Sequence, residues 1–268
     1  MWSSKMNEVT FSKWNNRPHY RFAVLGMSGL GKTFLSTQLK KLKTWEHYSV
    51  DYEIGKILFT DENRGLRNGF SINNLSNLSI FLGKPGNPSK GGIGFTEYIR
   101  RQRLHKQAEM LATLKSSQLI RNTPYDNFIC DTSGSICEIV NPSDPNDKIL
   151  KTLSENFLIV CLEADNDTYE TLIRRFTESP KPMYYEEPFL RMLWEKYLLK
   201  TNQDENKIDP DDFILYGYKA LVERRKKLFY MISKNWGISV NFNDIRKIKS
   251  GSDFVKLVKT QLNNKLVK

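Results

Sequence analysis

Gly26-Met27-Ser28-Gly29-Leu30-Gly31-Lys32-Thr33 is the stretch of this chain that decides its fold. It fits the pattern G-x-x-x-x-G-K-[ST], the phosphate-binding P-loop of proteins that use ATP or GTP. An apolar run of strand type, residues 22–25, precedes it, and residues 34–43, which contain neither Gly nor Pro, follow it. The sequence therefore predicts a strand, a glycine loop and a helix in that order.

A loop of this kind binds phosphate through its backbone. Glycines allow the N–H groups to turn toward phosphate oxygens, and the N-terminus of the helix adds a partial positive charge. We expect Lys32 to reach the β- and γ-phosphates and the Thr33 hydroxyl to bind Mg²⁺. A glycine-rich turn without a ligand is the alternative, but here the full motif coincides with its proper context. The predicted nucleotide-binding residues are Gly26, Met27, Ser28, Gly29, Leu30, Gly31, Lys32 and Thr33.

Length and composition are those of a folded protein. The chain has 268 residues, of which 39% are hydrophobic and 12% aromatic, enough for one large α/β domain or a core with an inserted lid. The cysteines Cys130, Cys137 and Cys161 are odd in number and lack paired spacing, which argues against a disulfide framework. No apolar run reaches the roughly 18 residues of a membrane span, so we expect a soluble cytoplasmic protein.

The positive charge is concentrated near the C-terminus. The formal net charge is +11, and from Lys219 onward the chain has 13 basic and three acidic residues. Such a region is either a surface for nucleic acid, acidic protein or anionic membrane, or a set of solvated helix faces. We favour solvated faces because no nucleic-acid-binding motif accompanies the charge.

Strands and helices are expected to alternate along the chain. The expected strands cover residues 20–25, 47–50, 127–130, 157–162 and 237–242. The expected helices cover residues 34–43, 53–59, 95–115, 165–176, 189–200, 212–235 and 252–263. This alternation predicts an α/β fold of the P-loop NTPase type, with a central, mostly parallel sheet covered by helices on both faces.

The domain organisation follows from the same pattern. We predict a flexible N-terminal arm, residues 1–19, and a single P-loop NTPase domain, residues 20–268. Residues 61–94 hold seven glycines and two prolines and are expected to be mostly loop. A stretch of this length without clear elements is usually functional, so residues 61–115 are assigned as a lid or substrate insertion.

Two aspartates follow expected strands. In parallel α/β sheets, ligands bind beyond the carboxyl ends of the strands. Asp131 closes the apolar strand 127–130 as in a Walker-B pattern, whose carboxylate orients Mg²⁺, so Thr33 and Asp131 are the predicted metal-site residues. Asp51 follows strand 47–50. The alternatives are an Asx turn or helix cap at Asp131 and a helix cap at Asp51.

The segment Val50-Asp51-Tyr52-Glu53-Ile54-Gly55 resembles small-molecule kinases of the shikimate and gluconate kinase type. The resemblance implies that Asp51 orients or deprotonates the acceptor hydroxyl. A wider resemblance, to a family of uncharacterised bacterial P-loop ATPases, spans roughly residues 20–242 and implies nucleotide binding without naming a substrate. Its segments are the P-loop and residues 47–55, 100–109, 131–135 and 180–185.

Basic residues follow the fourth expected strand. Nucleotide kinases carry a lid arginine at a similar place, which implies that Arg174, Arg175 or Lys181 neutralises charge on the transferred group. Further cations could hold an anionic substrate, although each is alternatively a solvated surface charge. These are Arg64, Arg67, Arg100, Arg101 and Arg103.

Three short motifs also match those of GTPases. They are the P-loop, Asp131-Thr132-Ser133-Gly134 as D-x-x-G, and Asn206-Lys207-Ile208-Asp209 as N-K-x-D. In GTPases the N-K-x-D motif closes a buried apolar strand. Here the polar residues Thr201-Asn202-Gln203-Asp204-Glu205 precede it, and they cannot form a central strand. This mismatch favours ATP over GTP.

These observations predict a Mg·ATP-binding P-loop protein. We expect an ATPase, or a kinase that transfers the γ-phosphoryl group to a small anionic or hydroxyl-bearing molecule. The alternatives are a GTPase switch and an ATP-driven module that binds protein or nucleic acid through Arg224-Arg225-Lys226-Lys227. The predicted catalytic residues are Lys32, Asp51, Arg174 and Arg175.

Overall fold

The computed structural model describes residues 14, 19–59 and 76–266, and these form two compact units. Unit 1 is made of the described parts of Met1–Val50, Ala112–Asp165 and Arg225–Lys268. Unit 2 is made of the described parts of Asp51–Leu111 and Asn166–Arg224. Most of the expected N-terminal arm lies outside the described residues, and so do Arg64 and Arg67 of the expected insertion. The division into arm, domain and insertion stays a prediction.

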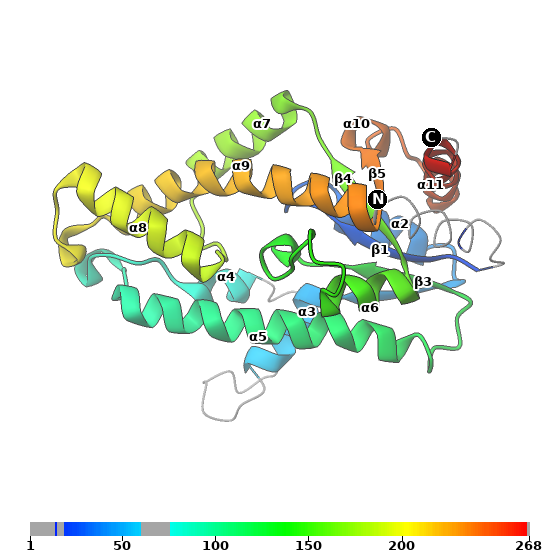
Figure 1. Ribbon diagram of the computed structural model, residues 1–268, viewed down its shortest axis with the longest axis horizontal. Coiled ribbons are helices and arrows are strands. Elements are labelled where there is room, and N and C mark those ends of the chain that lie inside the picture. Colours follow the sequence, from blue (N-terminus) through cyan, green and yellow to red (C-terminus); the bar gives the residue numbers. More distant parts are fainter. Residues whose placement is uncertain (1–13, 15–18, 60–75, 267–268) are drawn as a thin grey trace. The chain divides into compact units, whose positions relative to one another are not determined.

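Unit 1 is built on a five-stranded parallel sheet (Figure 1). The strand order is β2-β3-β1-β4-β5, and all four neighbouring pairs are parallel. β1 and β4 carry unbroken buried runs, as expected for strands covered on both sides. The strands are β1 (Arg21–Leu25), β2 (Trp45–Ser49), β3 (Asn127–Asp131), β4 (Leu158–Glu163) and β5 (Gly237–Asn241).

Helices cover both faces of this sheet. Phe22, Ile129 and His47 are in register across three strands and therefore share one face. On that face Phe254 of α11 (Gly251–Leu266) packs edge-on against Phe22, with ring centroids 5.7 Å apart. Tyr48 points to the opposite face, where its hydroxyl donates to the Ala112 carbonyl of α5 (Phe95–Leu119) at 2.6 Å. The predicted α/β fold is confirmed.

The remaining helices of unit 1 include two that the sequence did not predict. α2 (Lys32–Lys40) and the C-terminal part of α9 (Pro210–Trp236) lie where helices were expected. α10 (Phe242–Ile245) was not expected, because residue 242 was assigned to the last strand and no helix was predicted before residue 252. α6 (Lys148–Asn156) was missed because the Pro- and Asp-rich stretch before it reads as loop. Within that stretch the Asp147 carboxylate caps the helix, accepting from the N–H groups of Ile149 and Leu150.

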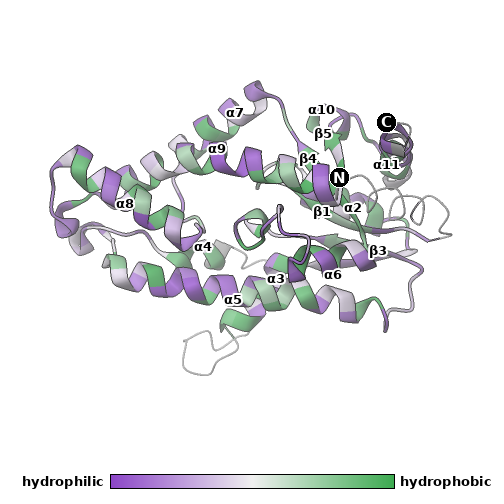
Figure 2. Cartoon of the chain, viewed as in Figure 1, coloured by the Kyte–Doolittle hydropathy of each residue, from purple (hydrophilic) through white to green (hydrophobic). Residues whose placement is uncertain are grey.

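Unit 2 is helical among its described residues. Besides the N-terminal parts of α5 and α9, it contains α3 from Asp51 onward (Val50–Phe59), α4 (Ser76–Leu82), α7 (Asn166–Glu178) and α8 (Glu187–Thr201). Trp194 of α8 stacks on Phe95 of α5 and meets Phe213 of α9 edge-on, with ring centroids 4.7 Å apart in both pairs. α5 and α9 carry both hydrophobic and hydrophilic residues along their length (Figure 2), and near their N-termini they contribute Phe95 and Phe213 to this aromatic cluster.

The described half of the glycine-rich segment is fixed to the start of α9. Asn87 N–H donates to the Ile208 carbonyl at 2.8 Å, and Gly86 N–H donates to the Ile93 carbonyl at 3.0 Å. A Cβ on Gly86 would lie 2.6 Å from the Ile208 oxygen, so only glycine permits this approach. The expectation of mostly loop holds for residues 83–94, whereas α4 was not expected.

A second connecting segment, residues 179–186, is held against α5 within unit 2. The Met183 carbonyl accepts from the Tyr98 hydroxyl at 3.2 Å and from the Gln102 amide at 3.3 Å. The Gln102 side-chain oxygen in turn accepts from Tyr185 N–H at 3.0 Å. The segment that carries Lys181 is therefore anchored by its backbone.

The three cysteines are buried and free. Burial raises the pKa of Cys130 to about 12 and that of Cys161 further still. Both thiols are protonated at neutral pH and act as small apolar side chains.

Candidate nucleotide-binding site

The P-loop connects β1 to α2 and has the backbone geometry of a phosphate-binding loop. Gly26, Gly29 and Gly31 have φ values of 151°, 91° and 83°, a range that strongly favours glycine. A Cβ on Gly26 would also lie 3.1 Å from the Leu162 Cβ atom of β4. Conformation and close packing therefore both require glycine where β1 ends.

The side chains of the loop divide between the core and the surface. Met27 and Leu30 are buried, and Leu30 N–H donates to the Met27 carbonyl at 3.3 Å. Ser28 and Gly29, at the tip of the loop, are exposed. The Met27 and Leu30 side chains thus hold the loop to the core. Only their backbone groups could serve the predicted binding of nucleotide.

Lys32 bends back over its own loop. Its side chain is buried, and Nζ donates to the carbonyls of Gly26 at 2.8 Å and Met27 at 3.4 Å. The N-cap residue of α2 is Gly31, which has no side chain to bond the first N–H groups of the helix. An ammonium group and uncapped helical N–H groups at one loop form an anion site.

Asp131 is placed beside the P-loop by strand pairing. It ends β3 in register with Val24 of β1, two residues before Gly26. The Thr132 N–H and hydroxyl both donate to the Val24 carbonyl, at 3.2 Å and 2.9 Å, which ties the chain after β3 to β1. The Asp131 carboxylate is largely buried.

These oxygen donors suit Mg²⁺. The hydroxyl of Thr33 is exposed in the first turn of α2, and carboxylate and hydroxyl oxygens are the ligands that this hard cation prefers. Within residues 14, 19–59 and 76–266, no group of three or more His, Cys, Asp or Glu residues could hold a metal ion. Thr33 and Asp131 thus fit an ion that takes only one or two ligands from protein and the rest from phosphate and water.

The loop after β3 lies directly against the P-loop. A Cβ on Gly134 would come 2.9 Å from the Ser28 nitrogen, so the two backbones touch and a side chain has no room. The Gly134 carbonyl accepts from Arg225 Nη1 at 3.1 Å, and Arg225 Nε lies 3.6 Å from Glu138 Oε1. Arg225 and Glu138 are both buried, and through Arg225 they hold the loop that contains Gly134.

Sequence reasoning missed Arg225 and His47. Arg225 was taken as part of a solvent-facing basic run, yet its spacing from Leu221, Val222 and Phe229 places it on the buried face of α9. His47, on β2, has its Nε2 atom 3.8 Å from Asp131 Oδ2. The sequence held no signal for this contact, because it depends on the pairing of β2 with β3.

The other candidate residues lie in unit 2. Strand β2 ends at Ser49 and α3 begins at Val50, so Asp51 follows the strand by two residues and lies in the first turn of the helix. Val50 was expected in the strand and instead begins the helix without an intervening turn. Arg174 and Arg175 are exposed on α7. The catalytic roles of Asp51, Arg174 and Arg175 stay predictions.

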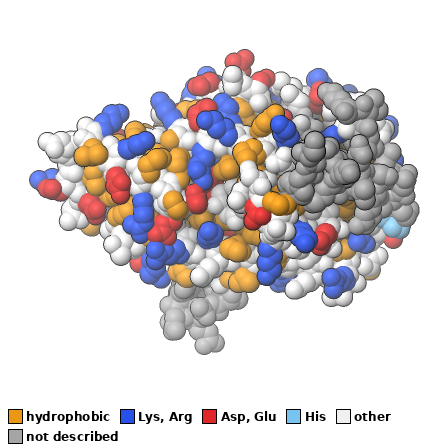
Figure 3. Space-filling model, in the orientation of Figure 1, with side chains coloured by type: hydrophobic (Ala, Val, Ile, Leu, Met, Phe, Trp, Pro, Cys, Tyr) orange, Lys and Arg blue, Asp and Glu red, His pale blue; other side chains and the backbone are white. Residues whose placement is uncertain are grey.

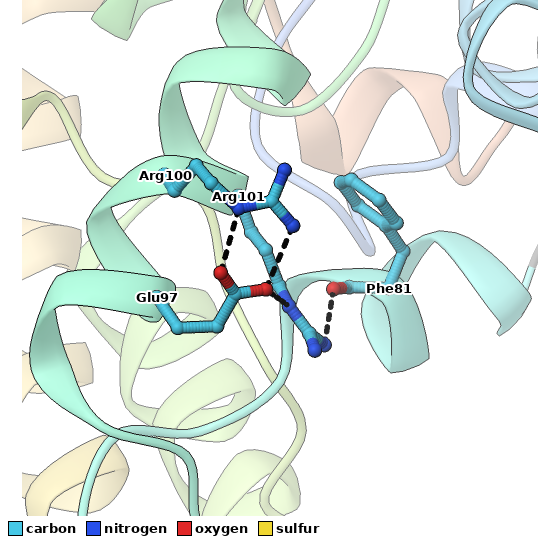
Figure 4. Close-up of polar contacts among 4 residues, drawn as sticks. All are labelled: Phe81, Glu97, Arg100 and Arg101. Atoms are coloured by element: carbon cyan, nitrogen blue, oxygen red, sulfur yellow. Dashed lines mark hydrogen bonds and ion pairs between the residues drawn. The ribbon is translucent and has the colours of Figure 1, made fainter. Parts of the chain in front are cut away.

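Three arginines of α5 are engaged in ion pairs within unit 2. Arg100 and Arg101 both donate to the Glu97 carboxylate, and Arg101 also donates to the Phe81 carbonyl (Figure 4). Hydrogen bonds from the two arginines lower the pKa of Glu97 to about 2. Arg103 pairs likewise with Glu187, whose pKa is also lowered to about 2 by that hydrogen bond and by Arg191. These arginines therefore stabilise unit 2.

Part of the basic C-terminal region is also structural. Arg224 donates to Glu186 at 2.6 Å in unit 2, and Arg225 is buried in unit 1. Lys265 Nζ donates to the Ser233 and Gly237 carbonyls near the end of α9, and burial lowers its pKa to about 8. On the face drawn in Figure 3, Lys and Arg side chains are interspersed with Asp and Glu side chains. A nucleic-acid partner gains no support.

A P-loop after the first strand of a parallel sheet, with an aspartate ending the neighbouring strand, defines an α/β P-loop NTPase fold. Among solved structures, the chain is similar to shikimate kinase from Bacteroides thetaiotaomicron, with 13% identity over 91% of this chain and 95% of that chain and a TM-score of 0.39. It is also similar to the thymidine kinase EHV4-TK complexed with TP4A, with 10% identity over 91% of each chain and a TM-score of 0.37.

No protein-family model and no curated protein sequence matches the chain. None of the helices within the described residues is long and apolar enough to cross a membrane.

Proposed function

We propose that the protein binds Mg·ATP and transfers the γ-phosphoryl group to a small hydroxyl-bearing or anionic acceptor. The observation that carries the proposal is that Lys32 and Asp131 are each placed beside the P-loop. Lys32 Nζ lies on the P-loop carbonyls, and Asp131 ends the strand beside the one that enters the loop. A cation and a carboxylate so placed suit the phosphates and the metal of a nucleotide.

The proposed reaction assigns a task to each residue. Backbone N–H groups of the P-loop and the start of α2 bind the phosphates, and Lys32 exchanges its loop carbonyls for β- and γ-phosphate oxygens. Thr33 and Asp131 hold Mg²⁺, which when bound neutralises charge on the phosphates. The acceptor oxygen forms a bond to the γ-phosphorus as the bond to ADP breaks. Asp51 accepts the proton of that hydroxyl, and Arg174 and Arg175 neutralise the transferred group.

The position of the N-K-x-D match supports ATP over GTP. Asn206 and Lys207 belong to a short 3-10 helix, Glu205–Lys207, and not to the end of a sheet strand. The Ile208 carbonyl bonds Asn87, and the Asp209 carboxylate pairs with Lys90 at 2.7 Å. These residues therefore hold the glycine-rich segment within unit 2, a role unrelated to reading guanine.

The test is ADP release from Mg·ATP, measured alone and with pools of small hydroxyl-bearing or carboxylate-bearing compounds. A kinase releases ADP faster with one pool, and the phosphorylated product appears in the same mixture. Release that no pool accelerates would identify a hydrolase. Lys32→Ala is the control, because a contaminating activity would survive that substitution. Release that is equal in the wild type and in Lys32→Ala would refute the assignment of the site.

A further inference from the structure

His47 and Asp131 lie on one face of the sheet, on neighbouring strands. His47 of β2 is in register with Ile129 of β3, and Asp131 follows Ile129 by two residues. Side chains two residues apart on a strand share a face, so the imidazole and the carboxylate point to the same side. Their side chains are 13% and 8% exposed, and Nε2 lies 3.8 Å from Oδ2.

The Nε2 atom of His47 is the unusual feature of this pair. It is buried, and among the described residues it has no hydrogen-bond partner. Burying a polar atom without a hydrogen bond costs free energy. Such atoms in native proteins call for an explanation, such as a catalytic role or a bridging water. The separation of 3.8 Å exceeds a hydrogen bond, yet a shift of about 1 Å or one bridging water would join the two groups.

The location of the pair indicates what the contact is for. Asp131 ends β3 beside the strand that enters the P-loop, where the proposed function requires a carboxylate for Mg²⁺. A carboxylate that serves a metal needs a fixed orientation, which outer partners commonly supply through hydrogen bonds. Tyr48, the next residue of β2, bonds α5 on the opposite face and holds the strand that presents His47.

We propose that His47 is a positioning residue of the magnesium site. In the Mg·ATP-bound protein, Nε2–H donates to Oδ2 of Asp131, directly or through one water, and leaves the other carboxylate oxygen to the metal and its waters. The Nε2 atom is the hydrogen-bond donor in this arrangement, as one ring nitrogen of an imidazole can be. The inference rests on the proposed function, since it requires Asp131 to serve Mg²⁺.

The test measures ATP binding by calorimetry at a series of Mg²⁺ concentrations and again in EDTA. His47→Leu removes the donor and keeps most of the side-chain volume. We expect the Mg²⁺ concentration that gives half of the metal-dependent gain in ATP affinity to rise about 10-fold or more, the range for lost outer-shell partners. ATP affinity in EDTA should not change. His47→Gln keeps an N–H donor and should restore most of the Mg²⁺ response.

His19→Leu is the matched control, because His19 Nε2 also lies 3.8 Å from an aspartate, Asp126, but with 47% and 72% of the two side chains exposed. It should behave like the wild type. Equal Mg²⁺ dependence in His47→Leu and wild type would overturn the inference. A loss of ATP affinity in EDTA as large as the loss in Mg²⁺ would also overturn it, by showing a structural role. If wild-type protein binds ATP without any Mg²⁺ dependence, the proposed function itself is wrong.

Discussion

Gly134→Ala tests whether contact between the loop after β3 and the P-loop sets nucleotide affinity. The added methyl carbon would lie 2.9 Å from the Ser28 nitrogen, 3.3 Å from its Cβ and 3.4 Å from its Cα. The φ of Gly134 lies outside the left-handed range, so the substitution adds volume without backbone strain. Two of the three atoms belong to the backbone, and neither moves as easily as a flexible side chain.

The size of the effect follows from where the strain can go. The P-loop is held at its start by the packing of Gly26 on Leu162, and the Gly134 carbonyl is held by Arg225. Overpacking of this kind costs about 1–3 kcal/mol. If the exposed tip of the P-loop shifts to relieve the contact, ATP binding must restore the original loop conformation. The cost then lowers ATP affinity about 5- to 150-fold.

The assay is calorimetric titration of ATP with Mg²⁺, together with the melting temperature of the free protein. Gly94→Ala is the matched control, because an added Cβ there meets no described atom within 4 Å. We expect weaker binding in Gly134→Ala and wild-type affinity in Gly94→Ala. Gly134→Ala that binds within twofold of wild type, with an unchanged melting temperature, would refute the reasoning.

Three further predictions concern the supports of the site and of unit 2. Arg225→Met leaves the Glu138 carboxylate buried without its cation and should lower the free energy of unfolding by about 3–5 kcal/mol in urea; a loss below 1 kcal/mol would show that the pair is solvated. The pKa values of Glu97 and Glu187 are lowered from 4.5 to about 2, so their ion pairs stabilise the fold above pH 4.5 and lose that effect as the pH falls toward 2. The melting temperature should therefore fall over this interval, and less so in Glu97→Gln/Glu187→Gln; an equal fall in both proteins would contradict it. Asp51→Asn should abolish phosphoryl transfer, measured as ADP release with acceptor, and keep ATP affinity. Unchanged transfer would favour the alternative that Asp51 only caps a helix.

The parts of the fold that local sequence determines were predicted well. The P-loop, its strand and its helix follow from glycine spacing and from one apolar run, and the position of Asp131 at the end of a strand follows from another such run. The parallel sheet with helices on both faces followed from alternation alone. The helices that were missed, α4, α6 and α10, are short. α4 and α6 also follow stretches rich in glycine, proline or aspartate.

The contacts that support the site could not be predicted, because they join residues far apart in sequence. Arg225 and Gly134 are 91 residues apart in the chain, and the sequence around Arg225 does not predict their hydrogen bond. His47 is visible as a partner of Asp131 only once the register of β2 and β3 is known. The N-K-x-D match is the opposite case, a motif that is recognisable in the sequence but has a structural role. Its residues Ile208 and Asp209 hold Asn87 and Lys90 in place.

The most direct test of nucleotide binding at the P-loop is the melting temperature of wild type and Lys32→Ala with Mg·ATP and with Mg·GTP. At 100 times its dissociation constant, a ligand that binds only the folded state adds about 2.7 kcal/mol, on the order of 5–10 °C for a chain of this size. We expect that rise for wild type with Mg·ATP, a smaller one with Mg·GTP, and none for Lys32→Ala. Equal stabilisation of wild type and Lys32→Ala by Mg·ATP, or no stabilisation of either, would contradict a nucleotide site built on Lys32.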